Sequence, residues 1–341
     1  MSDNDLKENE LNDIAKLNNM RFKNIDNPLF CYYNINSLRF KFEDLKEILQ
    51  KSLPDIVVFA ETKLDNTFIN SQFYLNEYFE PTRKDLTATS GGIIEYVRRG
   101  IVRKRLNEFE LFSFESIASE LIMNKKKYFI LSFYRTERNQ NKLTNVKHFL
   151  EELSGILDKV ISKYDEILLM GDINIDLHNC KSIGHKELKE FMVTYNLSNL
   201  IKDKTCFFSD QESSIDVMLT NSTNKYFNSF SLDIGVSDCH KMVGTFLRTK
   251  IARLKPKKIT YRSYKKLNMD LFLLELAKSL EHFTIESPSV GYDKFVEIIR
   301  KVLDKFCPLK TKIVRGNQNR FMNQNLSKAI MTRSRLRNKY L

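Results

Sequence analysis

One amphipathic segment between two short apolar runs constrains the fold of this chain more than any other feature. Its apolar residues fall on a single helical stripe: Val146, Phe149, Leu150, Leu153, Ile156, Leu157 and Val160. The run Lys127–Tyr134 precedes this stripe, and Ile167–Met170 follows it. A helix with one apolar face must bury that face, and the two flanking strands predict a sheet for it to pack on. The pattern therefore predicts an α/β fold.

The same alternation of short apolar runs and helical stripes extends over most of the first 250 residues. A predicted strand at Phe30–Asn34 is followed by a helix and then by a buried strand at Ile56–Ala60. A Ser-Gly-Gly turn at residues 90–92 predicts entry into a strand that reaches Val97, in which we expect Glu95 to face outward. Three later elements are predicted: a helix over Lys186–Tyr195 and strands over Ile215–Thr220 and Lys241–Arg248.

Composition excludes several classes of protein. Hydrophobic residues make up 42% of the 341 residues, which is too many for a wholly disordered chain. No apolar run approaches the roughly 20 residues needed to cross a bilayer, and the polar, acidic N-terminus lacks the features of a secretory signal. The five cysteines show no CxxC spacing, so the sequence indicates neither a disulfide framework nor a zinc site. We expect an intracellular protein, nuclear or cytoplasmic, with no membrane partner.

Charge is distributed unevenly along the chain. Residues 1–250 carry 34 Lys and Arg against 36 Asp and Glu, whereas residues 251–341 carry 21 against 7. The last stretch, Thr311–Leu341, holds eight basic residues and no acidic one. This excess suits a polyanion such as a nucleic acid better than a small neutral ligand. The alternative is a basic helix that is simply solvated.

These patterns divide the chain into three parts. Residues 1–27 are polar with weak periodicity and are expected to form a leader, either helical or disordered. Residues 28–250 form the predicted α/β domain. Residues 251–341 are expected to form a basic helical connector, with one helix through Leu271–Leu280 and another through Tyr292–Phe306.

Polar residues recur where the predicted strands end, which is where open α/β sheets place their reactive groups. The positions are Asn34 and Asn36, Glu61, Asp172 and Asn174, Asp216, and the segment Ser237-Asp238-Cys239-His240. A single acid at such a place is usually a solvated cap. Their joint recurrence favours one shared site.

The chemistry of these side chains suits the hydrolysis of a phosphodiester. Carboxylate and amide oxygens are ligands for Mg²⁺, which supports Glu61, Asn34 and Asp238 as metal ligands. A histidine held by a carboxylate keeps one tautomer and can be cationic near neutral pH, so Asp216 with His240 would form a donor pair. Taken alone, these residues indicate a metal-assisted hydrolase and no more.

Seven short segments in a fixed order resemble the motif series of the endonuclease/exonuclease/phosphatase superfamily. They are Asn34-Ile35-Asn36-Ser37-Leu38-Arg39, Glu61-Thr62-Lys63-Leu64, Ser90-Gly91-Gly92, Tyr134-Arg135, Gly171-Asp172-Ile173-Asn174, Ser214-Ile215-Asp216 and Ser237-Asp238-Cys239-His240. More closely, roughly residues 28–250 are similar to the endonuclease domain that begins the polymerase polyprotein of LINE-type (jockey-like) non-LTR retrotransposons. Residues 251–341 also resemble the segment that connects the endonuclease domain to the next domain in those elements. In that family a reverse transcriptase domain would follow, and we expect the 341 residues of this sequence to end before it.

The resemblance implies a four-layered sandwich, with two mixed β-sheets face to face, helices outside, a site at one rim and a C-terminal helical basic extension. Glu61 would be the principal ligand of Mg²⁺, with Mn²⁺ as an alternative, and Asn34 and Asp238 would lie close by. The remaining roles are also carried by the resemblance: Asp172 positions or deprotonates the attacking water, Asn174 binds the phosphate and orients Asp172, Tyr134 donates to the phosphate, and Asp216 orients His240, which stabilises the charge at phosphorus.

One departure from the family pattern concerns the last motif. The family usually has Ser-Asp-His, whereas Cys239 stands here between Asp238 and His240. Residues i and i+2 of an extended segment share a face, so a small bulge would bring Asp238 and His240 into one pocket. We favour His240 as the functional residue; the alternative places Cys239 there and loses the donor.

Three functions remain open from the sequence. The leading one is a Mg²⁺-dependent DNA endonuclease that nicks target DNA to prime reverse transcription, with the basic extension holding DNA or the retroelement RNA. The second is a phosphatase or phosphodiesterase of the same superfamily. The third is a retroelement fragment that binds nucleic acid without cutting it.

Overall fold

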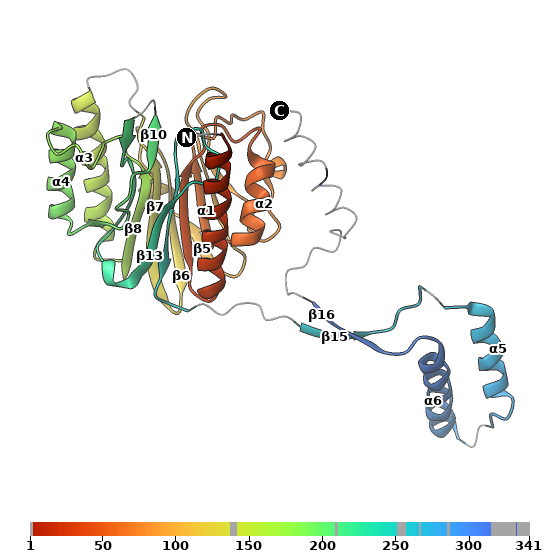
Figure 1. The fold of residues 1–341 in the computed structure, drawn as a ribbon. Coiled ribbons are helices and arrows are strands. Elements are labelled where there is room, and N and C mark those ends of the chain that lie inside the picture. The colour runs from red at the N-terminus through yellow and green to blue at the C-terminus, as the bar shows by residue number, and fades with distance from the viewer. Residues whose placement is uncertain are drawn as a thin grey trace. The chain divides into compact units, whose positions relative to one another are not determined.

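The computed structural model describes residues 3–136, 142–208, 211–250, 257–265, 267–284, 287–314 and 332. Its contacts divide the chain into a large unit that contains Met1–Arg253 and a small unit, Leu254–Asn323. The large unit holds both main sheets (Figure 1).

The first sheet has six strands in the order β13-β14-β1-β2-β4-β3. Its strands are β1 (Leu29–Asn34), β2 (Ile56–Ala60), β3 (Thr82–Lys84), β4 (Ile93–Val97), β13 (Tyr226–Leu232) and β14 (Met242–Leu247). Strands β1 and β2 run parallel and the other neighbours run antiparallel, so the sheet is mixed.

The second sheet also has six strands, in the order β5-β6-β7-β8-β12-β9. Its strands are β5 (Val102–Arg105), β6 (Glu115–Met123), β7 (Lys126–Tyr134), β8 (Glu166–Asp172), β9 (Ser198–Asn199) and β12 (Asp216–Thr220). Here β7 and β8 form the parallel pair. A short hairpin, β10 (Cys206–Phe208) with β11 (Gln211–Ser213), and three 3₁₀ turns, Asn70–Phe73, Asn107–Phe109 and Thr223–Lys225, complete the described elements of this unit besides its helices.

The alternation of side chains along each buried strand creates the layers. In β8, Leu168 and Met170 enter the core between the two sheets, whereas Ile167 and Leu169 pack towards the outer helices. Those helices are α3 (Lys142–Val160) and α4 (Ile183–Thr194). Both faces of each sheet are therefore covered, which explains why these strands read as continuous apolar runs. Figure 1 shows the two sheets between this pair of helices and a second pair, which is formed by the two N-terminal helices.

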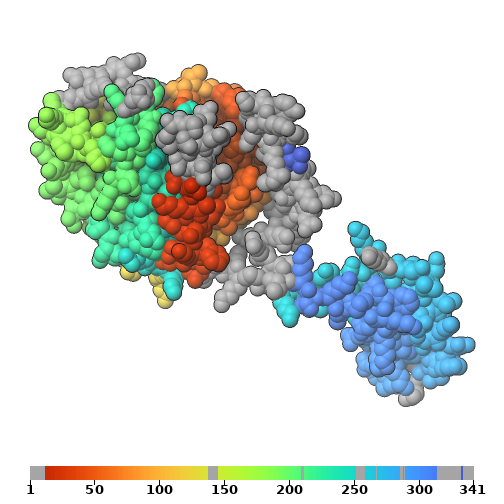
Figure 2. All heavy atoms as spheres, viewed as in Figure 1, coloured from red at the N-terminus to blue at the C-terminus, as the bar shows by residue number. Residues whose placement is uncertain are grey.

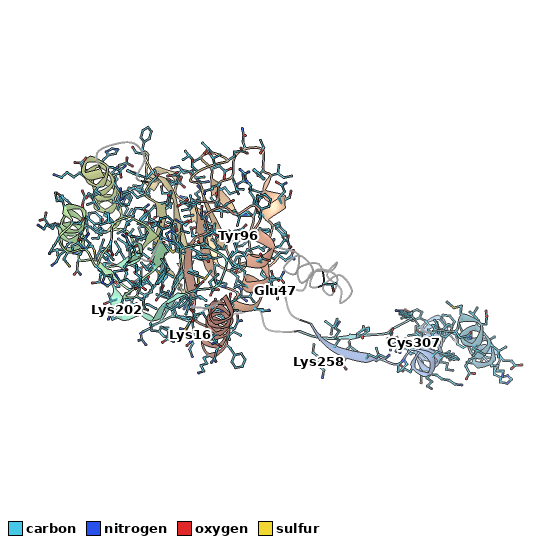
Figure 3. All side chains as sticks on the ribbon, turned by 45° about the horizontal axis from the view of Figure 1, so that its top comes forward. Lys16, Glu47, Tyr96, Lys202, Lys258 and Cys307 are labelled. Carbon is cyan, nitrogen blue, oxygen red and sulfur yellow. The ribbon has the colours of Figure 1, made fainter. Side chains whose placement is uncertain are left out.

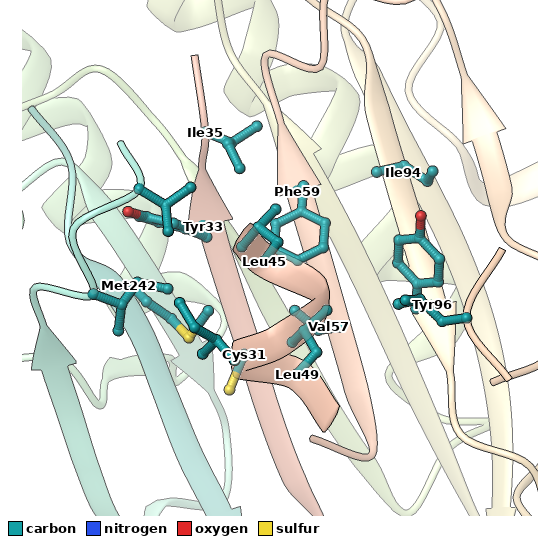
Figure 4. Close-up of a cluster of buried hydrophobic side chains, with 14 of the residues drawn as sticks. Cys31, Tyr33, Ile35, Leu45, Leu49, Val57, Phe59, Ile94, Tyr96 and Met242 are labelled. Carbon is teal, nitrogen blue, oxygen red and sulfur yellow. The ribbon is translucent and has the colours of Figure 1, made fainter. Parts of the chain in front are cut away.

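Helix α2 (Phe42–Ser52) covers the outer face of the first sheet. Its Leu45 and Leu49 lie over Cys31 of β1 and Val57 of β2 in one buried cluster (Figure 4). The helix ends at Leu53, whose left-handed conformation turns the chain and lets its N–H bond to the carbonyl of Leu49. The short connection from α2 leads directly into β2.

Residues 1–27 are largely a helix, α1 (Asp3–Lys23), that packs on the first sheet beside β13. Figure 2 shows the later part of this helix, in red, at the surface of the large unit. Leu17 is fully buried in the core on this face. At the end of the helix, the Arg21 guanidinium lies 3.1 Å from the carboxylate of Asp55, which is fully buried. The segment expected as a leader, helical or disordered, is thus a structural helix of this unit.

The small unit contains a β-ribbon as well as two helices. Its elements are β15 (Lys257–Tyr261), α5 (Met269–Leu280), α6 (Pro288–Phe306) and β16 (Lys310–Val314), with β15 and β16 antiparallel. Figure 3 labels Lys258 on the ribbon and Cys307, which is buried at the end of α6. The rest of the predicted connector, residues 251–256, 266, 285–286, 315–331 and 333–341, lies outside the described residues. In the part of the chain that is described, no helix has both the length and the apolarity to cross a membrane.

The four-layered α/β sandwich with a C-terminal helical extension is confirmed, but the expectation for Glu95 is wrong. Glu95 is buried on the face of β4 that meets the second sheet. There its carboxylate accepts a hydrogen bond from Ser119 and pairs with Arg103 at 2.6 Å. An ion pair and a hydroxyl satisfy the charge, so a buried acid interrupts the apolar run without facing solvent.

Replacing Leu17 with alanine is expected to lower the free energy of unfolding by about 2–4 kcal/mol, because it removes a buried side chain from the contact between α1 and the sheet. Phe22→Ala in the same helix is the matched control, since Phe22 is 80% exposed, and it should change stability by less than about 0.5 kcal/mol. Denaturant titration followed by circular dichroism measures both. Equal effects would contradict the docking of α1.

Candidate active site

The candidate site lies at one rim of the sandwich, where strands from both sheets end together. Asn34 at the end of β1 is in register with Ala60, the residue before Glu61, because β1 and β2 are parallel. In the second sheet, Tyr134 at the end of β7 is in register with Asp172 at the end of β8. The topology therefore collects the ends of four strands at one edge.

A chain of hydrogen bonds joins the two sheets at this rim. The Asn34 side-chain amide donates to Glu61 Oε1 at 2.9 Å and to Asp172 Oδ2 at 2.9 Å. The Tyr134 hydroxyl donates to the same Glu61 oxygen at 2.8 Å. Two carboxylates from different sheets are thus held around one amide.

Tight turns aim these side chains into the site. Asn36, Glu61 and Asn174 all follow strand ends and have left-handed backbones, with φ of 47°, 51° and 49°. Asparagine tolerates this region, but for Glu61 it is unusual and must be imposed by its surroundings. The backbone of the following residue, Thr62, is held by a hydrogen bond from its N–H to the carbonyl of Gly92.

Asp172, Asp216 and His240 form a buried acid and imidazole cluster. Asp216 begins β12 opposite Asp172, and its Oδ2 lies 3.0 Å from His240 Nδ1. His240 Nε2 lies 4.0 Å from Asp172 Oδ2. The imidazole therefore stands between two carboxylates, with its Nδ1 held by Asp216.

This burial shifts the proton affinities of the cluster. Burial, followed by the charge of Asp216, raises the pKa of Asp172 to about 7, although His240 and the bond from Asn34 oppose the shift. Burial lowers the pKa of His240, but the charge of Asp216 and the hydrogen bond to it raise that pKa well above its usual value. The arrangement favours a cationic imidazole beside a carboxyl group that can bind a proton near neutral pH.

Tyr134 stays protonated in this site. Burial raises the pKa of its hydroxyl, and the charges of Glu61 and Asp172 raise it further. The phenol is therefore available as a hydrogen-bond donor rather than as a base. In the structure the hydroxyl donates this hydrogen bond to Glu61.

Asn174 supports Asp172 through its backbone, while its side chain is engaged elsewhere. Its N–H donates to Asp172 Oδ1 at 2.9 Å, and its side-chain amide donates to the carbonyl of Arg135 at 2.7 Å. The Arg135 guanidinium is 1% exposed and donates to the carbonyl of Asn174 at 3.0 Å and to that of Ile173. The turn that carries Asp172 and Asn174 is fixed by this buried arginine.

Asp238 lies outside this network. Its carboxylate is 68% exposed, and its Oδ2 accepts from Lys41 and from the Asn36 amide, each at 3.2 Å. Among the described residues, the hydrogen bonds of Asp238 include none to Glu61 or Asn34. The rim therefore brings together Asn34, Glu61, Tyr134, Asp172, Asn174, Asp216 and His240, and places Asp238 at its solvent side.

The structure places His240, rather than Cys239, against Asp216. Residues 237–239 form a bend, in which the His240 N–H bonds to Ser237 Oγ at 3.4 Å. Because the segment is not extended, alternation does not apply to it, and His240 is buried while Asp238 is exposed. The expected shared pocket of Asp238 and His240 is not formed.

The oxygens at the rim fit a hard divalent cation. Glu61 and Asp172 bring carboxylates to the Asn34 amide, and such oxygen donors suit Mg²⁺ or Mn²⁺. Asp238 lies on the solvent side of these oxygens, where its Oδ2 is paired with Lys41. A second set of potential ligand atoms, from Asp172, Asp216 and His240, lies within 4.8 Å of one another.

A sequence model of the Endonuclease/Exonuclease/phosphatase family matches residues 31–238, a span that contains every residue of this rim except His240. The chain belongs to this family. No curated protein matches the chain.

Several solved structures share this fold at low sequence identity. The AP endonuclease LMAP from Leishmania major superposes with a TM-score of 0.57 at 14% identity, covering 66% of this chain and 88% of that one. The endonuclease domain of TRAS1, a telomere-specific non-LTR retrotransposon, gives 0.53 at 11% identity, covering 65% and 99%. The 3′ phosphatase NExo from Neisseria, bound to product DNA hairpin, gives 0.53 at 13%, covering 64% and 99%.

Three residues of the site escaped prediction. Arg135 follows Tyr134 in a noted motif, but no role could be assigned to it. The Tyr32 hydroxyl donates to the carbonyl of Phe133 across the sheets at 3.0 Å, and Thr205 Oγ1 accepts from the N–H of Asp216 at 3.0 Å. A lone polar group inside or beside an apolar strand was the only available signal.

Gly92→Ala is expected to destabilise the protein by about 1–3 kcal/mol and to displace Glu61. Gly92 has φ of 88°, and an added Cβ would lie 2.5 Å from Thr62 Oγ1. Gly155→Ala is the matched control: nothing lies within 4 Å of that Cβ and the position is helical, so it should stabilise by about 0.5–1 kcal/mol. Thermal unfolding compares them, and a neutral Gly92→Ala would show that the turn does not need glycine.

Proposed function

We propose that this protein is a Mg²⁺-dependent endonuclease that hydrolyses phosphodiester bonds in DNA. The observation that carries the proposal is the rim at which Asn34 joins Glu61 to Asp172, with the Asp216–His240 pair beside Asp172. These groups supply oxygen ligands, a base and a cationic donor within one site. Family membership and the similarity to DNA-processing structures support the choice of substrate.

Each residue has a role that its contacts allow. Glu61, with Asn34 and Asp238, would hold a Mg²⁺ ion, which neutralises charge on the phosphate when bound. Asp172, whose pKa is raised to about 7, accepts the proton of the attacking water. Its orientation is fixed by the Asn34 amide and the N–H of Asn174.

Three hydrogen-bond donors act on the phosphate itself. His240, cationic and oriented by Asp216, stabilises the negative charge that builds on the non-bridging oxygens. Tyr134 donates to the phosphate by releasing Glu61, and Asn174 contributes its amide by releasing Arg135. Water adds to phosphorus after giving a proton to Asp172, and the bond to the 3′ oxygen breaks. That oxygen takes a proton from solvent, so the products are a 3′-hydroxyl and a 5′-phosphate.

The basic part of the chain favours DNA over a small phosphate ester. The 21 basic residues against 7 acidic ones in residues 251–341 suit an extended phosphate backbone. Some belong to the β15–β16 ribbon, where Lys258 is exposed and Lys310 is paired with Tyr261. A long polyanion can contact several such basic residues at once.

Within this activity we assign the nick to priming of reverse transcription in a non-LTR retrotransposon. The support is the order of the seven motifs and the presence of the TRAS1 endonuclease domain among the similar structures. The 3′-hydroxyl at the nick would serve as the primer. The basic extension would hold DNA or the element's RNA nearby.

Purified protein is expected to convert supercoiled plasmid to the nicked form in Mg²⁺ and to lose this activity in a chelator. Glu61→Gln should lower the rate by roughly 10²-fold or more, because it keeps the acceptor for Asn34 and Tyr134 but removes the charge. Glu47→Gln on α2 is the matched control (Figure 3).

The chemical groups at the ends of the nick and the class of substrate distinguish the three hypotheses for the function. A nick that a polymerase extends without repair carries the 3′-hydroxyl that priming needs. Hydrolysis of phosphomonoesters without nicking would favour the phosphatase reading, and DNA binding without cleavage in Mg²⁺ would favour a silent binding protein. Either result would reject the endonuclease.

His240→Ala is expected to slow nicking by roughly 10²–10³-fold, because it removes the donor that Asp216 orients. His178→Ala, at an exposed position after β8, is the matched control and should keep the rate. Single-turnover nicking assays measure both. A larger loss in Cys239→Ala than in His240→Ala would contradict the assignment and return the role to Cys239.

A further inference from the structure

A second group of ligand atoms lies beside the catalytic pair and is chemically unlike the oxygen set. The sulfur atoms of Cys206 and Cys239 and a ring nitrogen of His240 all lie within 4.8 Å of one another. Cys206 and His240 are buried, and Cys239 is half-buried. Two thiols and an imidazole therefore share one small volume that opens to solvent on the side of Cys239.

Backbone hydrogen bonds hold these three residues together independently of their side chains. Cys206 pairs with His240 in an antiparallel bridge. On either side of it, the Phe207 N–H donates to the carbonyl of Cys239 at 2.7 Å, and the Lys241 N–H donates to the carbonyl of Thr205 at 2.8 Å. The backbone positions of the three residues are thus set before any ion arrives, which reduces the ordering that binding requires.

We propose that Cys206, Cys239 and His240 form a binding site for a thiophilic divalent cation of the Zn²⁺ class. Zn²⁺ takes thiolate and imidazole ligands at about 2.3 Å and 2.0–2.1 Å in tetrahedral geometry, so the ligand atoms need to approach each other by about an ångström. Water at the half-exposed side fills the fourth position. Binding releases to solvent the protons that the two thiols carry and one proton of the cationic His240 imidazole, because both kinds of ligand bind the metal in their deprotonated form. Mg²⁺ prefers oxygen ligands and does not compete for this site.

The other cysteines show that this grouping is not general. Cys31 is buried in the core under α2, and Cys180 is exposed on the loop after β8. Neither of them, nor Cys307 at the end of α6, belongs to a group of three possible ligands among the described residues. No CxxC spacing marks the site in the sequence, since its two cysteines are brought together only by the pairing of residues 205–207 with 239–241.

Occupancy of this site would remove His240 from the acid cluster. Its Nδ1 lies 3.0 Å from Asp216 and its Nε2 lies 4.0 Å from Asp172, so recruitment of either nitrogen by a cation disrupts one of these contacts. Zn²⁺ would therefore inhibit the hydrolysis. This consequence rests on the proposed function, whereas the binding site itself does not.

The binding test uses the full chain, reduced with a phosphine and held in excess Mg²⁺. Titration with Co²⁺ should give a thiolate-to-metal charge-transfer band that saturates at one equivalent, and Zn²⁺ should displace the Co²⁺. Cys206→Ser and Cys239→Ser are each expected to weaken binding by about 10–100-fold, and Cys180→Ser is the matched control. A wild type without the band, or serine variants that bind as well as Cys180→Ser, would overturn the site.

Two further measurements keep the test decisive. Zn²⁺ should raise the unfolding temperature of the wild type and of Cys180→Ser but not of Cys239→Ser, which is half-buried and decides the matter if Cys206→Ser does not fold. The ratio of nicking rates without and with one equivalent of Zn²⁺ should be large for Cys180→Ser and near one for Cys239→Ser. Absence of nicking in every sample would count against the proposed function, while the Co²⁺ band would still decide the site.

Discussion

The hydrogen bonds from the Asn34 amide to Glu61 and Asp172 are the interaction on which the site depends. The two carboxylates belong to different sheets and would repel each other if both were charged. One amide, buried at the end of β1, donates to both at 2.9 Å and fixes their separation. A cation bound at Glu61 would relieve the same repulsion, so the Asn34 amide and the proposed metal ion would both stabilise two carboxylates at close range.

Because the site spans two sheets, its geometry depends on how they pack. The Tyr134 hydroxyl reaches from the second sheet to Glu61, and the Tyr32 hydroxyl reaches from the first sheet to the carbonyl of Phe133. Beneath them, Leu168 and Met170 of β8 fill the space between the sheets. A close-packed core does not deform gradually, so a small shift between the sheets would displace the proposed base and the proposed metal ligands together. The packing between the sheets therefore determines both the stability of the sandwich and the geometry of the site.

The sequence revealed the parts of this protein that obey simple periodicity and hid those that depend on distant partners. Strands β1, β2, β7 and β8 were predictable because both their faces are buried and their residues are apolar. The nine-residue strand β6 was missed, since Glu115, Ser116 and Ser119 are buried in it and mask its pattern. The prediction for Glu95 was wrong because its partner Arg103 lies on another strand, so the sequence around Glu95 does not indicate the ion pair. The rim residues could be named from strand ends, but which of them touch could not.

The segment around Cys239 shows why spacing in a motif is not the same as spacing in a site. One inserted residue would reverse the facing of its neighbours in a strand, but residues 237–239 are bent, and the bridge to Cys206 fixes His240 instead. The insertion is accommodated by turning Asp238 out to Lys41 while His240 keeps Asp216. The same bend carries the Cys239 sulfur towards that of Cys206, which strand β10 supplies from another part of the chain. The segment that departs from the family pattern thus leaves the His240 imidazole against Asp216 and places a second sulfur beside it.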